Sequence, residues 1–205
     1  MFSIVLLGSC AKEGCTDVNA INYNSEATID DGSCEIVNIG DTYQGGIIFY
    51  LDGNGGGLVA APIEQVPSGN VPALSWGCSG VLIIGSNGVS VGTGNQNTID
   101  IELGCITPET AADICSNLSI GGYSDWYLPS KDELNLIWEN LADSDGDGNN
   151  IGMSDSNNLG GFERNHYWSS SQIDNYNALQ QTFSDGNQSD CDKGSLRLVR
   201  AVRTF

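Results

Sequence analysis

Alternating carboxylates occupy the segment ADSDGDGNNIG, residues 142–152. The aspartates stand at every second position: Asp143, Asp145 and Asp147. With Gly148 they match the first half of an EF-hand-type calcium loop, in which alternate carboxylates converge and a glycine permits the sharp turn. The second half departs from that pattern, because position twelve is Ser154 and not a bidentate glutamate. Calcium would therefore need further oxygen ligands such as Asn149, and a flexible acidic insertion is the alternative.

Catalytic residue types are scarce in this chain. His166 is the only histidine, and the sequence has neither a GxSxG nucleophile elbow nor an HExxH metalloprotease motif. The segments GNGGG and GTGNQ lack the lysine and the following helix that a phosphate-binding loop uses, so we expect turns there. We therefore expect a non-enzymatic function.

The first ten residues, MFSIVLLGSC, form an apolar run that ends in small residues and Cys10. This run resembles a bacterial lipobox, in which the cysteine receives the lipid and becomes the mature N-terminus. We predict that residues 1–13 are a lipoprotein signal and tether, with Cys10 as the lipidation site, which implies an oxidising, extracytoplasmic compartment. A cleaved secretory signal and a buried N-terminal strand remain alternatives, because the usual positively charged n-region is missing.

Setting Cys10 aside from the seven cysteines leaves six. They are Cys15, Cys34, Cys78, Cys105, Cys115 and Cys191. An even number in an oxidising compartment predicts three disulfides. A structural zinc site is not expected, since the chain has no CxxC pair and a single histidine.

Residues 14–36 form a small unit bounded by Cys15 and Cys34. A bridge between these two would stabilise a segment too small for its own core by about 3 kcal/mol. Its many Asp and Asn residues supply oxygen ligands for calcium, but Asx turns use the same residues, and we favour the turns. The unit resembles a short Cys-flanked Asp/Asn-rich repeat of secreted Bacteroidota proteins.

The charge balance excludes one class of partner. Seven Lys and Arg against 26 Asp and Glu give a formal net charge of −19. Such a chain is repelled by phosphate backbones and by anionic lipid surfaces. We expect no nucleic-acid partner, and membrane contact only through a lipid anchor.

Two helices between groups of strands indicate an α+β fold. One helix is expected to begin at a Thr107 cap with Pro108 in its first position, and the other at a Ser130 cap that Glu133 completes as a capping box. Helical spacing predicts a buried face on the second helix: Leu134, Ile137, Trp138 and Leu141. Strands are expected in QGGIIFYLD, GGLVAAP, YWSSSQ, ALQQTF and LRLVRAVRTF, and ordered loops with short strands in residues 71–105.

The segments GYSDWYLPSKDEL, YWSSS and VRAVR resemble the DUF1566 or Lcl C-terminal domain family. GGIIFYLD, GGLVAAP, WGC and GTGNQNT stand in that family's usual order, so the resemblance covers residues 40–205. It implies a C-type-lectin-like domain in which two helices pack on antiparallel strands brought together near the chain ends. It also implies a secreted or surface-anchored protein, and in one member the binding of sulfated glycosaminoglycans.

The resemblance also bears on individual residues. Sulfate binding needs clustered cations, and we expect the arginines of LRLVRAVR to pair instead with carboxylates at the edge of the core or with helix C-termini. The strand YWSSS stands where sugar-binding lectins place ligand contacts, which makes three residues the candidate ligand-binding set: Trp168, Ser169 and Ser170. By analogy with lectin-like folds, the four cysteines of the domain would pair as Cys78–Cys105 and Cys115–Cys191.

Taken together, these features predict a non-enzymatic, surface-exposed outer-membrane lipoprotein. It would bind a glycan or a protein through the long loops 68–105 and 142–166, since loops on a rigid scaffold commonly carry function. Calcium is the one cofactor considered. A structural subunit of an envelope or extracellular assembly is the alternative, followed by an enzyme of the related oxidase branch.

Overall fold

A computed structural model describes residues 11–66, 73–143, 145–146 and 156–205. The contacts divide the chain into two compact units, Met1–Asn38 with Leu51–Gly56 and Ile39–Tyr50 with Gly57–Phe205. We refer to them as the small unit and the large unit. Cys10, the predicted lipidation site, lies outside the described residues.

In the small unit, the short strands β1 (Glu13–Gly14) and β2 (Ile29–Asp30) pair in parallel. The predicted Cys15–Cys34 disulfide is present. Asx turns use the acidic residues: Asp17 Oδ1 accepts from Asn19 N at 2.9 Å, and Asp31 Oδ1 accepts from Ser33 N at 2.9 Å. These side chains accept hydrogen bonds from backbone N–H groups two residues further on, as expected for Asx turns.

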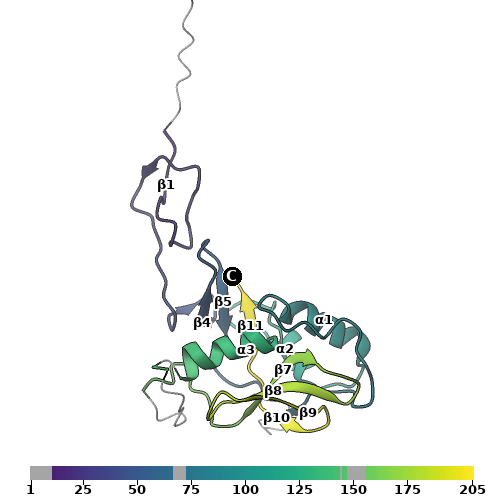
Figure 1. Ribbon diagram of the computed structural model, residues 1–205. Helices are drawn as coiled ribbons and strands as arrows, with labels where there is room; N and C mark the ends of the chain where they lie inside the picture. Colours follow the sequence, from purple (N-terminus) through teal and green to yellow (C-terminus); the bar gives the residue numbers. More distant parts are fainter. Residues whose placement is uncertain (1–10, 67–72, 144, 147–155) are drawn as a thin grey trace, which may run out of the picture. The chain divides into compact units, whose positions relative to one another are not determined.

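The first sheet of the large unit joins its beginning to its end. β3 (Thr42–Tyr43), β4 (Gly46–Leu51) and β5 (Gly57–Ala60) are followed in the sheet by the last strand, β11 (Val202–Thr204), in the order β11-β5-β4-β3. β11 runs antiparallel to β5, and Arg203 stands opposite Val59. Figure 1 shows the yellow C-terminal strand beside β5, which confirms that early and late strands meet.

A second sheet lies in the other half of the large unit. β7 (His166–Gln172), β8 (Asn177–Thr182) and β9 (Gln188–Asp192) form an antiparallel meander, and β9 was not expected from the sequence. A two-stranded sheet pairs β6 (Leu74–Ser75) with β10 (Leu196–Arg197). The expected C-terminal strand is therefore split into β10 and β11. The fold is mixed α and β with antiparallel sheets in this unit.

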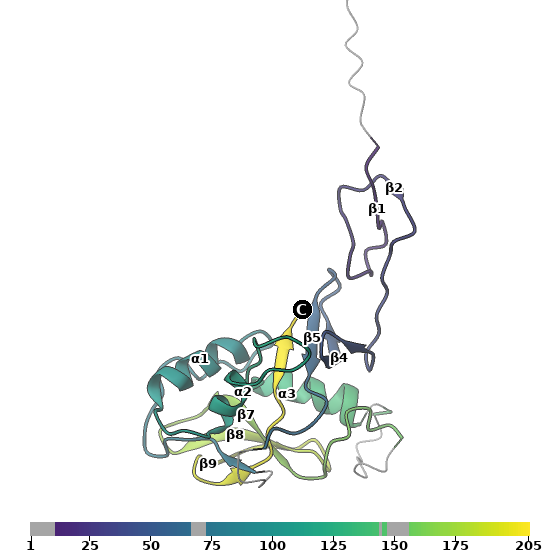
Figure 2. The ribbon, with the colours of Figure 1, turned by 180° about the vertical axis from the view of Figure 1, so that it is seen from behind.

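The described residues hold three α-helices, one more than the sequence indicated. α1 (Gly94–Gly104) begins within GTGNQ, so the expectation of turns and loops there is wrong. α2 (Ala111–Ser116) is capped by Thr110 and not by Thr107, because Glu109 has a left-handed φ of 56° that breaks a helix at that point. α3 (Lys131–Ile137) has the predicted capping box and continues as a π-helix, Trp138–Ala142. Figure 2 shows α1 and α2 from behind.

The core lies where α3 packs on the sheets. Leu134, Ile137 and Leu141 are buried as predicted, whereas Trp138 is only partly buried. Three rings form its aromatic part, with Tyr167 and Phe183 centroids 4.3 Å apart and Phe162 and Phe183 centroids 5.1 Å apart. The helix-spaced apolar face of α3 therefore anchors the large unit.

Glu133 is fully buried and connects three segments of the large unit. Its two carboxylate oxygens accept from Gly92 N and from Ser130 N, each at 2.7 Å. Ser130 Oγ donates to Ser90 O at 3.0 Å, so the cap of α3 also holds the loop before α1. A Cβ on Gly94 would stand 2.2 Å from the same carboxylate, which explains why the first residue of α1 is glycine.

Two C-terminal arginines form ion pairs across the large unit. Arg200 is buried and pairs with Glu64, which also accepts from Tyr167 Oη at 2.6 Å. Arg203 binds both oxygens of Asp125, at 2.7 and 3.0 Å. These pairs agree with the expectation that the arginines meet carboxylates at the edge of the core. Arg197 differs, since it donates to Gln180 Oε1 and to Cys191 Sγ.

The cysteines are only partly paired as expected. Cys78 and Cys105 form a disulfide, but the predicted Cys115–Cys191 bridge is wrong. Cys115 is buried in α2 close to Glu102 of α1, whereas Cys191 lies in β9 beside Arg197. The pairing implied by lectin-like folds is wrong because α2 and β9, which carry the two cysteines, do not bring their thiols together.

No helix in the described part of the chain is long and apolar enough to cross a bilayer.

The first prediction concerns the buried carboxylate. Glu133→Gln should lower the free energy of unfolding by about 1–3 kcal/mol, because the amide group would face a backbone N–H where the carboxylate oxygen accepts. Glu139→Gln, on the same helical segment but hydrogen-bonded only to Asn135 at an exposed site, should change it by less than about 0.5 kcal/mol. Urea unfolding followed by tryptophan fluorescence measures both. Equal losses in the two variants would contradict the assigned role of Glu133.

The second prediction concerns the disulfide that encloses α1. Replacing both Cys78 and Cys105 by Ser should cost about 3 kcal/mol, since the bridge closes a loop with a sequence separation of 27. All four tryptophans, at positions 76, 126, 138 and 168, lie in the large unit, so their fluorescence reports on it alone. Reductant should destabilise the wild-type large unit and leave the double variant unchanged. A wild-type protein unaffected by reductant would contradict the prediction.

Candidate functional site

The candidate ligand-binding residues of β7 lie inside the protein. Trp168, Ser169 and Ser170 are each at most 1% exposed. Trp168 Nε1 donates to Leu74 O at 2.9 Å, and Ser169 Oγ donates to Leu179 O at 2.8 Å. Ser170 Oγ accepts from Asn97 Nδ2 at 3.0 Å. The prediction that they contact a ligand is therefore wrong, because α1, absent from the sequence-based picture, covers this strand.

The proposed calcium ligands are only partly described. Asp147 and Asn149 lie outside the described residues. Asp143 is buried at the end of the π-helix, and Asp145 is exposed and accepts from Asn157 Nδ2 at 2.7 Å. Within the described ranges, no group of three or more His, Cys, Asp or Glu side chains could hold a metal ion. Calcium binding by residues 143–149 stays a prediction.

Large aliphatic side chains are instead exposed on α1 and in the segments next to it, and Leu82, Ile84 and Leu103 line one hollow there. They come from the loop before α1, from its outer side and from the residue after its disulfide: Leu82, Ile84, Ile99, Leu103 and Ile106. Ile84 is 88% exposed, Leu103 79% and Ile106 95%. We call these five residues the apolar face. Exposed apolar side chains so grouped mark sites of interaction.

Buried polar side chains hold the loop of the apolar face from inside. Gln172 Oε1 accepts from Ile83 N at 3.1 Å, and Gln172 Nε2 donates to Ile83 O. Lys193 Nζ donates to Val81 O at 3.0 Å and to Gln172 Oε1 at 2.8 Å. Because these bonds fix the backbone of residues 81–83, the neighbouring side chains of Leu82 and Ile84 are held outward.

Lys193 is an unusual residue for this position. Its side chain is buried, and its Nζ lies 4.5 Å from the centre of the Trp76 ring. Burial lowers the pKa of Lys193 to about 8, and the negative charge of Asp174 acts in the opposite direction. The contacts of Nζ are a carbonyl, an amide oxygen and a ring, so the ammonium replaces its lost hydration with neutral acceptors.

The inner side of α1 fixes the orientation of its outer side. Asn97 exchanges hydrogen bonds with the backbone of Gly88, at 3.1 and 2.7 Å. Thr98 Oγ1 accepts from Leu128 N at 3.0 Å. Ile83 packs on Gly104, whose absent Cβ would stand 3.0 Å from Ile83 Cδ1. With the Cys78–Cys105 bridge at its end, α1 can hardly turn to bury Ile99 and Leu103.

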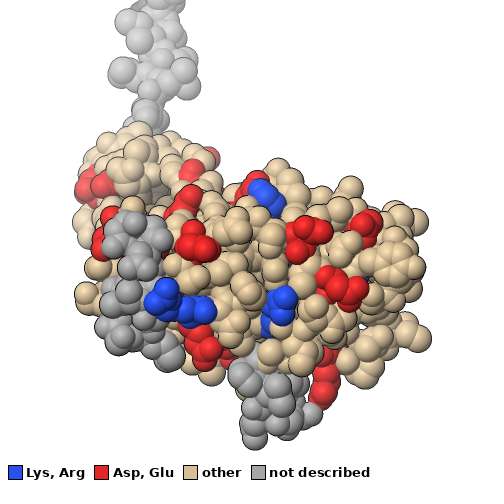
Figure 3. All heavy atoms as spheres, turned by 60° about the horizontal axis from the view of Figure 1, so that its bottom comes forward, with Lys and Arg blue, Asp and Glu red and all other residues tan. Residues whose placement is uncertain are grey.

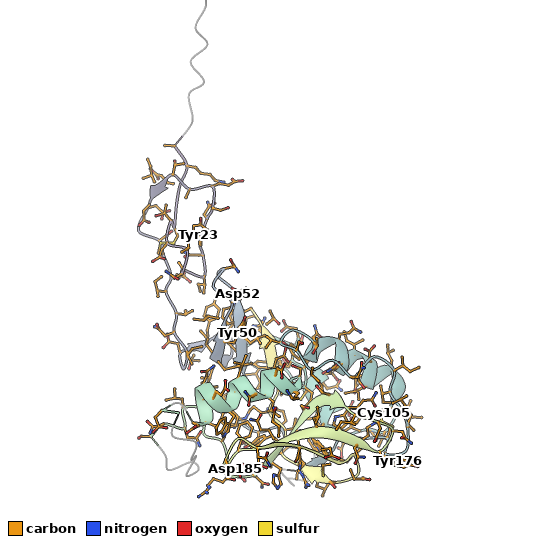
Figure 4. All side chains as sticks on the ribbon, viewed as in Figure 1. Tyr23, Tyr50, Asp52, Cys105, Tyr176 and Asp185 are labelled. Atoms are coloured by element: carbon orange, nitrogen blue, oxygen red, sulfur yellow. A yellow bond between two sulfur atoms is a disulfide. The ribbon has the colours of Figure 1, made fainter. Side chains whose placement is uncertain are left out.

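The disulfide end of α1 adjoins the β7–β8 turn. Gly80 N donates to Asn175 O at 2.8 Å, and the next residue, Tyr176, is 55% exposed. Figure 4 shows Cys105 and Tyr176 at the same end of the large unit. An exposed tyrosine next to aliphatic side chains is a common component of protein interfaces.

Two hollows flank Leu103. One, of about 300 Å³, is lined by residues 82–84 together with Asp100, Leu103 and Gly104. The other, of about 320 Å³, lies between α1, α2 and residues 124–126. Carboxylates also line both hollows, Asp100 in the first and Glu102 and Asp125 in the second. The apolar face is therefore not flat, but offers depressions that could receive side chains.

Carboxylates predominate on this surface, and the two cations that approach it are already bound, Lys193 by Val81 O and Gln172, and Arg203 by Asp125. No Lys, Arg or His lies between Lys12 and Lys131, and the apolar face falls entirely within that span. Asp100 and Glu102 belong to α1 itself, with Asp113 in α2. On the face drawn in Figure 3, Lys and Arg form small separate patches among Asp and Glu. Anions are thus disfavoured near α1, and cations are favoured.

Two titratable groups with shifted pKa values, Cys115 and His166, lie in different elements, α2 and β7. Burial raises the pKa of the Cys115 thiol, and the charge of Glu102 raises it further. Burial and the nearby Arg197 lower the pKa of His166, whose Nδ1 lies 2.9 Å from Thr182 Oγ1. The surface around α1 offers apolar side chains and carboxylates.

Sequence reasoning missed the apolar face for an identifiable reason. Ile99, Ile101 and Leu103 alternate, a pattern closer to a strand than to a helix, and only Ile101 is buried. The run VLII falls in residues 71–105, for which the sequence predicts ordered loops and short strands without indicating which side chains are exposed. The sequence feature that could have indicated this surface is a group of aliphatic residues between two cysteines, Cys78 and Cys105, that form a disulfide.

The third prediction concerns Lys193 and pH. Since its pKa is about 8 in the folded protein and ordinarily 10.5, the unfolded chain binds more protons between those values. Stability due to this group should therefore rise as pH increases from about 8 to about 10.5. The unfolding free energy of wild type minus that of Lys193→Met, each measured by urea titration, should increase over this range. A difference that is independent of pH would contradict the burial of a charged Lys193.

Comparison with known proteins identifies the domain. The model of the Lcl C-terminal domain matches residues 73–203. A crystal structure of a fimbrial protein from Bacteroides ovatus ATCC 8483 is similar, with 16% identity and a TM-score of 0.43, over 71% of this chain and 35% of that chain. This chain thus spans about a third of the length of that protein. No curated protein matches. The match over more than half of the sequence confirms the resemblance seen in its motifs: the chain belongs to the Lcl C-terminal domain family.

Proposed function

We propose that this chain is a non-enzymatic binding domain of an extracytoplasmic surface protein, and that it docks a protein partner on the apolar face. One observation carries the proposal. Aliphatic side chains as exposed as Ile84, Leu103 and Ile106 are costly to leave in water, yet a disulfide and buried polar side chains hold them outward. A surface maintained in this way is best explained by a partner that covers it.

The partner is expected to have an apolar centre and a basic rim. The apolar face is bordered by carboxylates, and the span between Lys12 and Lys131 has no cation. A second copy would bring like charges together, which opposes association. A glycan would leave hydroxyl groups unpaired over aliphatic side chains. An anionic membrane would be repelled. A basic protein surface therefore fits this face best.

An extracytoplasmic location is supported by the disulfides. Cys15–Cys34 and Cys78–Cys105 are typical of an oxidising compartment, where disulfides form and persist. In the proposal, Cys10 anchors the chain to the outer membrane as a lipoprotein and the large unit faces outward. The pairing of β5 with β11, which joins the two ends of the unit, supports the lectin-like scaffold that the family resemblance implied. The proposal includes calcium bound by residues 143–149.

The fourth prediction tests the apolar face. Peptides selected by display on the purified chain should be rich in aliphatic residues with Lys or Arg nearby. The triple variant Leu82→Ser, Ile84→Ser, Ile106→Ser should bind them at least about 100-fold more weakly, because each lost apolar contact is worth about 1 kcal/mol or more. Its thermal stability should stay close to that of wild type, since the three side chains are exposed. Titration calorimetry measures the affinities.

A matched control is available elsewhere on the large unit. Ile63 and Val66 are also exposed, at 64% and 48%, but they line a different hollow with Leu118. Ile63→Ser with Val66→Ser should leave peptide binding unchanged. The proposal is overturned if the peptides bind the triple variant as well as wild type, if only glycans bind, or if sedimentation shows that the chain covers this face by dimerisation.

A further inference from the structure

The hollow between α1 and residues 124–126 combines apolar walls with carboxylates. Ile99, Leu103 and Trp126 are the apolar residues of its lining, and the cavity measures about 320 Å³. Glu102 and Asp125 also line it. Its apolar walls and its volume match an extended side chain better than a hydrated ion. An elongated ligand group with a polar end therefore has a place in it.

Glu102 has the less compensated of these two carboxylates. It accepts a hydrogen bond from Ser116 Oγ at 3.3 Å and makes no salt bridge with any described residue. Partial burial raises its pKa, and the charge of Asp113 raises it further. Two neighbouring carboxylates without a cation between them repel each other, and a bound cation would relieve that repulsion.

Asp125 contributes in a different way. Both of its oxygens bind Arg203, yet its side chain is 60% exposed and keeps room for a second donor. The Arg203 guanidinium stacks on Tyr123, 4.0 Å from the ring centre, so Asp125 is held in place. The rim of the hollow is thus rigid on this side.

We propose that this hollow binds the side chain of a lysine or arginine from the partner, with its methylene stem between Ile99, Leu103 and Trp126 and its cationic head at Glu102. The inference rests on the proposed function, and it names the anchor group of the partner. Long cationic side chains bury their stems on apolar surface while the head stays polar. A ligand with a carboxylate or a neutral polar head would remove water from Glu102 without supplying an opposite charge.

Alternative occupants fit less well. A divalent metal ion would need several oxygen ligands, and the described residues contain no cluster of three or more acidic, His or Cys side chains suited to it. A purely aliphatic group would fill the walls but leave Glu102 facing it. The combination of stem and charge therefore distinguishes Lys and Arg from other side chains.

The experiment uses small probes, so it does not depend on finding the partner. Butylguanidinium and butylammonium are titrated into the full chain, with butanol as the neutral probe of the same length. We expect saturable shifts of the Trp126 indole and of the methyl groups of Ile99 and Leu103 with the two cations only. Glu102→Gln should weaken cation binding about tenfold, in line with one charge-assisted hydrogen bond.

Glu109→Gln is the matched control, because it removes the same charge from an exposed position just before α2. It should leave cation binding unchanged. The inference is overturned if butanol binds as well as the cations, if shifts do not saturate, if they occur away from α1, or if both variants weaken binding equally. Leu82, Ile84 and Ile106 do not line this hollow. If the cations fail to bind but the triple variant still loses peptide binding, the inference is wrong and the proposed function stands.

Discussion

The buried carboxylate of Glu133 is the interaction on which the arrangement of the large unit depends. Hydrogen bonds from the backbone amides of Gly92 and Ser130 replace the water that this carboxylate lost on burial. They join the loop before α1 to the cap of α3. Burial raises the pKa of Glu133, and these amides act against that rise. A buried carboxylate with both oxygens occupied leaves little freedom to the segments that surround it, so α1 can only begin where Gly94 clears it.

The same logic of buried polar groups extends to the surface that we propose as functional. Gln172 and Lys193 lie in the region of the second sheet and bind the backbone of residues 81–83 from within. An unsupported loop with aliphatic side chains would collapse onto the protein to bury them. Here the polar bonds and the Cys78–Cys105 bridge oppose collapse, so the cost of exposure is met by the rest of the fold.

The distribution of charge gives this surface its selectivity. The cations of the C-terminal segment are used inside the large unit, where Arg200 meets Glu64 and Arg203 meets Asp125. They are therefore not free to neutralise the carboxylates of α1 and α2. An apolar centre with an acidic rim results, and a basic partner gains both hydrophobic burial and faster association, whereas anionic ligands gain neither.

Local features of the large unit were determined by sequence alone. The capping box of Ser130 and Glu133, the buried stripe of α3, and the family itself followed from residues close together in the chain. The tertiary structure decided the rest. α1 lacks helical periodicity and is held by Asn97 and Thr98, whose partners lie up to 73 residues away. Trp168, Ser169 and Ser170 are buried because α1 and β6 cover them, and the cysteine pairing depends on which elements become neighbours. Capping and periodicity are short-range properties that a sequence displays directly, whereas burial and exposure arise from contacts between distant segments and exist only once the chain is folded.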